Sequence, residues 1–436
     1  MAKIIPFRGI LYNQKNVGYL HKVATPPYDV ITPKKQDEYY KKSPYNIVRL
    51  DLGKEIAGDN LKINKYIRAN NFINEWLEKD ILYRDEIPSF YFHTQTYCLK
   101  NNLRKVRSGF IALVKIEDFE SGVVLPHEKT FKKVTSDRLE LLRHCKTNLS
   151  QVFGLYPDKT NKINKLFNTG LGKPEIELKD EEGSIHRLWK ITDTRKIRKI
   201  QKDIEKKPLF IADGHHRYET ALNYRNERRQ RDKKFTGEEP YNYVMMYLSN
   251  MDDVGLTILP THRLLKNFSP IMTSELEKYF FVKKYPFRDE KQKTSQLKML
   301  IAKMEKGRLK KHLFGLYLSG ENSFLLLTLK DHNHVLEKLE HGKPREWAEL
   351  DVVVLHYILI HTIFKVKEED ISYLADTEIA CDKVDQKEFK AVILLNPTKI
   401  SQVKKIASLG ERMPHKSTYF YPKILTGLVI NSLKDY

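Results

Sequence analysis

The sequence predicts a mixed α/β protein of the α+β type, because helical and strand patterns alternate along its 436 residues without an internal repeat. The clearest case lies near the middle of the chain. PLFI, at residues 208–211, is too short for a helix and indicates a buried strand. Tyr218, Ala221, Leu222 and Arg225 then recur at helical spacing. We therefore expect a strand, a turn and a helix in succession.

Similar local signals predict the elements that come before. Thr32 and Pro33 suit the N-cap and the first position of a helix. In chain order, the patterns predict a helix at 33–42, a strand at 46–52, a β-hairpin at 90–97 and 106–116, and a helix capped by Ser136 or Asp137.

A soft domain boundary is expected near Gly237, where ThrGlyGluGluPro interrupts the periodicity. An N-terminal α+β region, residues 1–236, would end with the strand, turn and helix described above. A C-terminal α+β region, residues 237–436, would contain a hairpin and a buried helix from Leu350 to Phe364, and would close with the polar loop MPHKSTYFYPK.

Composition excludes several classes of protein. The chain has 77 basic and 56 acidic residues, but lysines occur throughout, so the charge of +21 does not by itself predict a nucleic-acid partner. Three widely spaced cysteines exclude a disulfide scaffold and fit a reducing compartment. The longest apolar stretch, 352–364, is broken by His356, His361 and Thr362. A cytoplasmic protein without a membrane partner is expected, and its oligomeric state stays open.

The sequence AspGlyHisHisArg, residues 213–217, occupies the predicted turn. Gly214 lets another group approach the backbone, and the first amides of the following helix point outward without partners. His215, His216 and Arg217 crowd this positive end of the helix, where cations are unfavourable unless an anion is also bound. The turn therefore predicts phosphate or carboxylate binding. Asp213 would then serve as a general base or as a magnesium ligand.

Two other interpretations of this turn stay open. In a purely structural one, Asp213 is the N-cap of the helix and one histidine is a core residue bonded to a carbonyl. A metal site is the other. Adjacent helical residues do not face the same way, and no HxxxH or HxH spacing supports the histidine pair, so no metal ligand is assigned.

Four further loops each combine a proline with a dense set of polar residues. Each of them taken alone is typical of a solvated loop, whereas their shared form suggests that they converge on one pocket, and the sequence leaves both interpretations open. They carry Tyr28 and Asp29; His127, Glu128 and Lys129; His262 and Arg263; and His415, Lys416, Ser417 and Thr418 with Lys423.

Several of these segments contain sequence motifs that resemble those of a known protein family. PPYDVIT, NIVRLDL, LPHEKT with SDRLELLR, ADGHHRYETA, ILPTHR, LDVVVLH and MPHKSTYFYPK, in this order, resemble the bacterial and archaeal family known as domain of unknown function 1015. The resemblance spans nearly the whole chain, and ADGHHRYETA is its most specific part. Because the family is uncharacterised, the resemblance implies no activity.

The turn is also similar to the phosphate-binding turn of the ParB and sulfiredoxin superfamily, which includes kinases of free serine. This second resemblance implies a nucleotide-binding core elaborated with extra strands and helices, in which His216 and Arg217 hold phosphates. The reactive cysteine of sulfiredoxin falls on His215, so sulfinic-acid repair is not expected. In the serine kinases an aspartate precedes the GlyHis, as Asp213 does here, and a glutamate earlier in the chain takes part. Glu128 is our candidate for that glutamate.

The resemblance favours a nucleotide-dependent phosphotransferase that acts on serine, phosphoserine or a similar small acid, with ATP or ADP and Mg2+ as cofactors. The expected catalytic residues are Asp213, Glu128 and His215; the phosphate- or nucleotide-binding residues are Gly214, His216, Arg217, Lys416, Ser417 and Thr418; and the substrate-binding residues are Tyr28, Asp29, His127, His262 and Arg263.

Two alternatives belong to other classes. A non-catalytic, nucleotide-switched binding protein like ParB would touch nucleic acid with the basic run from Arg225 to Lys234, although strand patterns after Gly237 leave no clear helix-turn-helix. A metal-assisted hydrolase would use His215, His216, His127 and His262.

Overall fold

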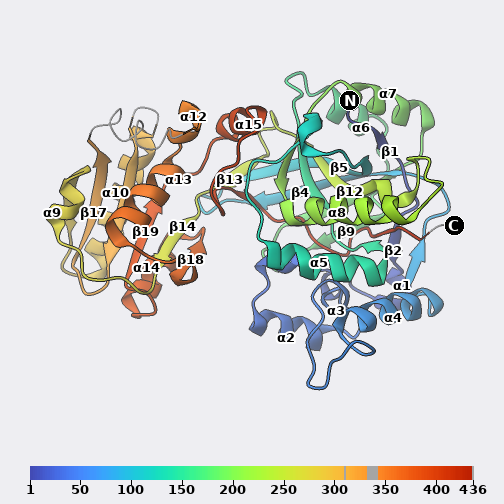
Figure 1. The fold of residues 1–436 in the computed structure, drawn as a ribbon, viewed down its shortest axis with the longest axis horizontal. Helices are drawn as coiled ribbons and strands as arrows, with labels where there is room; N and C mark the ends of the chain where they lie inside the picture. Colours follow the sequence, from blue (N-terminus) through green and yellow to red (C-terminus); the bar gives the residue numbers. More distant parts are fainter. Residues whose placement is uncertain (309–310, 331–341, 435–436) are drawn as a thin grey trace. The chain divides into compact units, whose positions relative to one another are not determined.

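The computed structural model describes residues 1–308, 311–330 and 342–434 (Figure 1). The chain forms two compact units. Unit 1 comprises Met1–Pro126, Thr130–Thr257 and Pro422–Tyr436, and unit 2 comprises His127–Lys129 and Ile258–Tyr421. The boundary predicted near Gly237 falls inside unit 1, because strand β12 (Tyr243–Asn250) after it pairs with two strands of the unit 1 sheet.

Unit 1 is built on a nine-stranded mixed sheet, in the order β6-β11-β8-β12-β5-β4-β10-β9 with β1 beside β5. The predicted hairpin is confirmed as β4 (Phe90–Cys98) and β5 (Arg104–Lys115), in which Gln95 lies opposite Arg107. The other strands are β1 (Ile4–Ile5), β6 (Val124–Leu125), β8 (Val152–Tyr156), β9 (Ile176–Lys179), β10 (Ile185–Ile191) and β11 (Leu209–Asp213).

The two faces of this sheet differ in chemistry, because successive residues of a strand point to opposite sides. Phe110, Ala112 and Val114 of β5 belong to an apolar core with α6 (Lys162–Asn168), α7 (Thr194–Glu205) and α8 (His215–Arg231). The opposite face carries Arg107 and Gln95, and the main chain at Lys423 accepts a hydrogen bond from Gln95 Nε2 (3.2 Å). The apolar face builds the core, and the polar face carries the site described below.

A helical region of unit 1 contains α2 (Pro33–Lys42), α3 (Val48–Asp51), α4 (Lys65–Glu78) and α5 (Lys132–Cys145), and α5 lies beside α8 (Figure 1). The strand predicted at 46–52 is wrong. The Asn46 side chain accepts a hydrogen bond from Val48 N (3.0 Å) and begins a short helix instead. The predicted cap is also wrong: α5 begins at Lys132, so Ser136 and Asp137 lie inside it.

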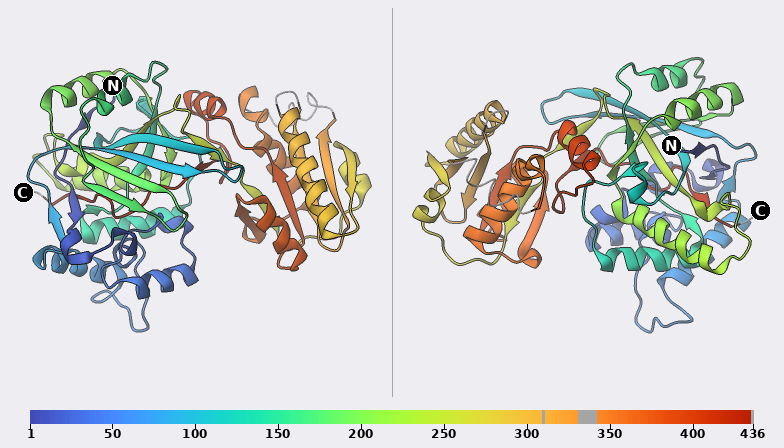
Figure 2. Two further views of the ribbon diagram at one scale, coloured as in Figure 1. Left: turned by 180° about the vertical axis from the view of Figure 1, so that it is seen from behind. Right: turned by 45° about the horizontal axis from the view of Figure 1, so that its top comes forward.

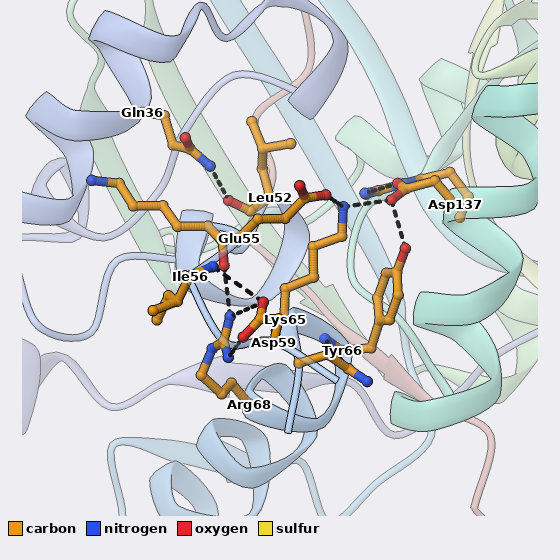
Figure 3. A network of polar contacts seen from close by, with 12 residues as sticks. Gln36, Leu52, Glu55, Ile56, Asp59, Lys65, Tyr66, Arg68 and Asp137 are labelled. Carbon is orange, nitrogen blue, oxygen red and sulfur yellow. Dashed lines mark hydrogen bonds and ion pairs between the residues drawn. The ribbon is translucent and has the colours of Figure 1, made fainter. Parts of the chain in front are cut away.

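Asp137 has a different role, which is to tie α5 to α4 (Figure 3). Its Oδ1 atom lies 2.8 Å from Lys65 Nζ and 2.8 Å from the Tyr66 hydroxyl. Its Oδ2 atom accepts a hydrogen bond from Arg138 Nε (2.9 Å). Although burial opposes ionisation, these partners lower the pKa of Asp137 to about 2, and Arg138 contributes most. The network holds Arg138 in place beside the turn at Tyr28.

Unit 2 contains a separate antiparallel sheet of six strands, in the order β15-β17-β16-β19-β14-β18. The predicted hairpin is confirmed as β16 (Leu313–Leu318) and β17 (Ser323–Leu329). The remaining strands are β14 (His262–Leu265), β15 (Phe280–Pro286), β18 (Ile371–Leu374) and β19 (Ala391–Leu395). The two sheets together confirm the mixed α/β class.

Helices cover both faces of the unit 2 sheet. Residues of α10 (Glu290–Gly307) and α14 (Thr377–Asp385) pack on one face (Figure 2). On the other face lie α13 (Asp351–Val354), η5 (Leu355–Phe364) and α15 (Ile400–Ser408). The buried helix expected at 350–364 is present, but its second part, η5, is a π-helix. Among the described residues, no helix has both the length and the apolar character needed to cross a membrane.

Candidate functional site

The AspGlyHisHisArg turn joins β11 to α8, as the sequence predicted. The pairing of β11 with β8 shifts register between Ile211 and Asp213, an irregularity that re-aims the last side chain of the strand. Gly214 follows with φ of +84°, a conformation that favours glycine. A Cβ atom there would lie 2.8 Å from Nε of Arg217. The glycine therefore allows both the turn and the close return of the Arg217 side chain.

Asp213 is held between two cations of unit 1. Its Oδ1 atom accepts a hydrogen bond from Lys423 Nζ (2.6 Å), and its Oδ2 atom accepts one from Arg217 Nη2 (2.9 Å). Arg217 Nη1 also donates to the main-chain oxygen of Gln151. The three charged side chains are between 11 and 19% exposed, so solvent screens them little. This arrangement is a compact, partly buried ion-pair cluster at the end of a strand.

The ProProTyrAsp turn lies near this cluster, because Arg217 interacts electrostatically with Tyr28 and Asp29 as well as with Asp213. The guanidinium of Arg138 lies over the Tyr28 ring, 4.2 Å from its centroid. Asp51, which is 5% exposed, also faces Arg138 and Arg217, but the loss of solvation dominates and raises its pKa. Carboxylates and cations thus meet in one region of unit 1.

Arg107 is the most deeply buried cation of this region. Its side chain is fully buried and donates one hydrogen bond, from Nη2 to Gln95 Oε1. The guanidinium also lies 5.0 Å from the centroid of the Phe153 ring and 5.8 Å from that of Tyr247. Its Nε and Nη1 atoms have no acceptor at full hydrogen-bond geometry within the described part of the chain, although the Tyr247 hydroxyl makes a looser hydrogen-bond contact with the guanidinium.

Such a cation is expensive to bury. Desolvation lowers the pKa of Arg107, and Asp213 is among the groups that oppose this shift. A buried charge that lacks full pairing costs several kcal/mol, on the order of the stability of a small domain. Donors that point into a protein interior near a second arginine and a lysine are typical of a site for an anion.

The two histidines of the turn differ in their surroundings. His216 Nε2 accepts a hydrogen bond from the main-chain N–H of Phe131 (2.8 Å), so this nitrogen carries no proton in the contact. The His216 ring also stacks on Phe131, with 6.1 Å between ring centroids and an interplanar angle of 11°. Phe131 is the N-cap residue of α5, so His216 helps to fix the start of that helix. His215 is 8% exposed and packs inside unit 1.

A second polar cluster lies in unit 2, where the HisGluLys and HisLysSerThr loops pair with each other. Glu128 Oε1 accepts a hydrogen bond from the main-chain N–H of Lys416 (2.9 Å). His127 Nε2 lies 3.0 Å from Thr418 Oγ1. Ser417 Oγ donates to the main-chain oxygen of Pro414 (2.6 Å). The polar groups of these loops are largely engaged with one another.

Arg263 and His262 of β14 are the most buried members of the unit 2 cluster. His262 Nε2 lies 2.8 Å from Thr377 Oγ1, and burial lowers the pKa of His262 to about 3. Arg263 lies 5.1 Å from the centroid of the Tyr373 ring, and its Nη2 atom donates to the main-chain oxygen of His415 (3.4 Å). Burial also raises the pKa of Tyr373 to about 12, although Arg263 opposes this shift.

The protein-family model described as "Protein of unknown function (DUF1015)" matches residues 4–353. The chain belongs to this family. Among solved structures, a conserved hypothetical protein from Pyrococcus furiosus is 14% identical, with a TM-score of 0.33, over 72% of this chain and 92% of that one. A free serine kinase in complex with AMP is 13% identical, with a TM-score of 0.35, over 72% of this chain and 86% of that one.

SbnI with a C-terminal truncation, from Staphylococcus aureus, is 9% identical, with a TM-score of 0.34, over 72% of this chain and 85% of that one. Similarities with TM-scores below 0.5 carry no argument about function. A search of the curated proteins found no match of significance.

The predicted site residues of this DUF1015 chain form two sets. Unit 1 holds Tyr28, Asp29, Asp213, Gly214, His215, His216 and Arg217, and unit 2 holds His127, Glu128, His262, Arg263, Lys416, Ser417 and Thr418. A cavity of about 480 Å³ in unit 2, lined in part by Lys311, His312 and Asp351, contains none of them. The chemistry of the predicted residues therefore does not coincide with that cavity.

Several residues of the unit 1 site were not predicted from the sequence. Arg107, Gln151, Asp51 and Arg138 were not assigned there, and Lys423 was named only as part of a loop. The position of Arg107 could have been predicted from the strand pattern. In the segment VRSGFIALV it falls on the same strand face as Ile111 and Leu113, so alternation alone places a charge on a buried face.

Proposed function

We propose that unit 1 binds the phosphates of a nucleotide, ATP or ADP, and that the protein transfers a phosphoryl group to or from a small acid such as serine or phosphoserine. One observation carries the proposal: Arg107 is fully buried beside the cluster of Asp213, Arg217 and Lys423, and two of its donor atoms have no acceptor at full hydrogen-bond geometry among the described residues. Phosphate oxygens accept several hydrogen bonds at once and would neutralise these cations. The resemblance of the turn to phosphate-binding turns agrees with this assignment.

Each residue of the cluster has a role in such a reaction. Arg107, Arg217 and Lys423 would stabilise the charge that develops on the transferred phosphoryl group, which is the main source of catalysis in phosphoryl transfer. Asp213 would be released from its two cations when phosphate binds between them. It would then accept a proton or face Mg2+, whose preferred ligands are carboxylate oxygens of the kind that Asp213 and Asp29 supply.

Glu128 is the proposed second acid–base residue, and Lys416, Ser417 and Thr418 are proposed phosphate contacts. These assignments rest on their sequence context. For Glu128 to act as a base, its Oε1 atom would have to exchange the Lys416 N–H for a substrate proton, since that hydrogen bond occupies one oxygen. His215 and His216, which are respectively buried and bonded to Phe131, would position the turn.

The test is a transfer assay with purified protein. Serine is incubated with ATP or ADP labelled on the terminal phosphate, and labelled phosphoserine is incubated in parallel without nucleotide. We expect label to move between nucleotide and serine, and to move more slowly in Asp213→Asn. Absence of transfer with serine and related small hydroxy acids, together with absence of nucleotide binding, would reject the proposal.

No comparable observation supports either alternative function, the ParB-like binding protein or the metal-assisted hydrolase. In the basic run from Arg225, the first arginine is 2% exposed and donates to the main-chain oxygen of Ile116 (2.7 Å), so it is not available to nucleic acid. Arg229 donates to Asn242 Oδ1 (2.8 Å). For the metal-assisted hydrolase, the group of potential ligands found in the described part of the chain contains none of the four histidines suggested by the sequence.

A further inference from the structure

Three potential metal ligands meet on η5 and the segment after it, in unit 2. They are His356, His361 and Glu368, and each offers one ligand atom within 4.8 Å of the other two. His356 Nε2 lies 3.3 Å from Glu368 Oε1. The two imidazole rings are nearly perpendicular, at 87°, with 4.4 Å between their centroids. None of the three residues takes part in the proposed phosphoryl transfer.

The π-helix is what brings the two histidines together. In an α-helix each residue turns by about 100°, so residues five apart would point about 140° away from each other. A π-helix is hydrogen-bonded between residues five apart, which stacks His356 and His361 on one side. Thr362 Oγ1 repeats this spacing by donating to the main-chain oxygen of Tyr357 (2.8 Å). π-Helical turns are rare and frequently occur at functional sites.

The spacing of the ligand atoms suits a tetrahedral ion. With bonds of about 2.0–2.1 Å to nitrogen and oxygen, the edge of a zinc tetrahedron is about 3.3–3.4 Å. The distance between His356 Nε2 and Glu368 Oε1 is 3.3 Å. The His361 ligand atom lies within 4.8 Å of the other two, and its side chain is exposed, so a change of side-chain rotamer would have to bring it to a similar separation when the ion binds.

A second hydrogen bond also fixes the orientation of the Glu368 carboxylate. The Tyr373 hydroxyl donates to Glu368 Oε2 (3.2 Å), while Oε1 is the atom that faces His356. A hydrogen bond to the outer oxygen of a metal-binding carboxylate is a common way to fix its direction. Glu368 therefore already has the type of second partner that metal ligands have.

We propose that His356, His361 and Glu368 bind a divalent transition-metal ion, Zn2+ by their ligand chemistry, with the fourth position open. Two histidines and one carboxylate form a ligand set of the open type, whereas closed structural sites use four protein ligands. One carboxylate leaves the bound ion with a net positive charge. Arg263 and Lys129 interact electrostatically with His356, and these two cations favour an anion as the fourth ligand.

The experiment uses the untagged full-length chain after treatment with a chelator. Zn2+ is titrated by calorimetry, and Co2+ is titrated as a spectroscopic probe whose visible absorption reports tetrahedral geometry. We compare the unaltered chain with His361→Ala and Glu368→Gln. The matched controls are His21→Ala, at an exposed histidine of unit 1, and Glu369→Gln, at the adjacent exposed glutamate.

We expect one Zn2+ per chain, with affinity reduced on the order of 100-fold or more in both ligand variants and unchanged in both controls. Tyr373→Phe should weaken binding by about 10- to 100-fold. Circular dichroism and urea unfolding without metal should be the same for His361→Ala, Glu368→Gln and both controls, since these four side chains are exposed. The proposal would be overturned if the unaltered chain bound no Zn2+, or if His361→Ala and Glu368→Gln bound it as tightly as the unaltered chain does. Because the readout is metal binding, neither result depends on phosphotransferase activity.

Discussion

The polar clusters of the two units differ in how completely their groups are paired. In unit 1, Arg107 is fully buried, and two of its donor atoms have no acceptor at full hydrogen-bond geometry among the described residues. Asp213 lies between Lys423 and Arg217. In unit 2, Glu128 accepts the Lys416 N–H, and His127 and Ser417 have partners within the same pair of loops. One donor atom of the buried Arg263, Nε, has no acceptor in the described part of the chain. Buried donors that the chain leaves without acceptors are typical of a ligand site, so the unit 1 cluster carries the stronger indication of a ligand. The paired loops of unit 2 would have to exchange their internal hydrogen bonds for bonds to a substrate before they could take part.

The largest expected effect is on phosphoryl transfer when a carboxylate of either cluster is neutralised. Asp213→Asn should lower kcat/KM by about 100- to 1000-fold, or about 3–4 kcal/mol, and should also change nucleotide affinity, because its two cations lose their partner. Glu128→Gln should lower kcat by a comparable factor and leave nucleotide affinity unchanged. The measurements are steady-state rates and calorimetric titration with nucleotide.

These two variants also test the comparison itself. Normal rates in Glu128→Gln would restrict the chemistry to unit 1. Normal rates in Asp213→Asn would instead remove the unit 1 cluster from the reaction.

The next effect concerns the buried arginine. Arg107→Met should weaken binding of nucleotide by about 30- to 300-fold, which is about 2–3 kcal/mol, because the phosphate loses charged hydrogen bonds. The free energy of unfolding without nucleotide should stay unchanged or rise, since an apolar side chain of similar length replaces an unpaired charge. Calorimetry and urea unfolding measure the two quantities.

Arg187→Met is the matched control for Arg107→Met. Arg187 lies on β10 of the same sheet, and its side chain is 33% exposed and paired with Glu177. Arg187→Met should change neither the nucleotide affinity nor the free energy of unfolding. A strong loss of stability in unliganded Arg107→Met would instead show that the arginine has a structural role.

A smaller effect, on stability, is expected where paired charges join helices α4 and α5 of unit 1. Asp137→Asn should lower the free energy of unfolding by about 2 kcal/mol at pH 7, because the pKa of Asp137 is lowered to about 2 in the folded chain. Because the pKa of Asp137 is lower in the folded chain than in the unfolded chain, the ionised carboxylate stabilises the fold at pH values above the unfolded pKa, which is near 4. The difference between Asp137→Asn and the unaltered chain should therefore disappear as the pH falls from about 5 towards 2. A difference that persists at pH 2 would contradict the electrostatic origin.

The smallest effect tests whether His262 of unit 2 is structural. Its pKa is lowered to about 3 by burial, so the unfolded chain gains a proton near pH 6.5 and the folded chain does not. Its contribution should destabilise the fold by about 1–2 kcal/mol between pH 7 and pH 5, and His262→Gln should remove that part of the pH dependence in urea unfolding. If His262→Gln kept the pH dependence but lost activity, His262 would be a substrate residue, as the sequence predicted.

Part of the site was predictable because it depends on residues that are close in the chain. The apolar run before Asp213, the glycine and the helical spacing after it specify the strand, turn and helix, and the structure confirms all three. Local signals failed where a tertiary contact competed with them. At 46–52 the β-branched residues suit a strand, but the Asn46 side chain bonds both Val48 N and the main-chain oxygen of Lys22, and a helical turn forms.

The partners of Asp213 and the histidine pair were beyond prediction for a different reason. Lys423 is 210 residues from Asp213, and no local pattern indicates that pairing. His356 and His361 looked like interruptions of an apolar helix, because five-residue spacing separates side chains in the α-helix that the sequence favours.

The sequence by itself determined the fold class, the strand-turn-helix at residues 208–231 and the family, since these depend on local periodicity and on contiguous motifs. The tertiary structure decided which charges are buried together. It placed Arg107, Arg217 and Lys423 around Asp213 and turned η5 so that His356 meets His361. The physical reason is that burial and pairing of a charge depend on strands and segments far apart in the chain, and on a backbone geometry that residue spacing does not specify.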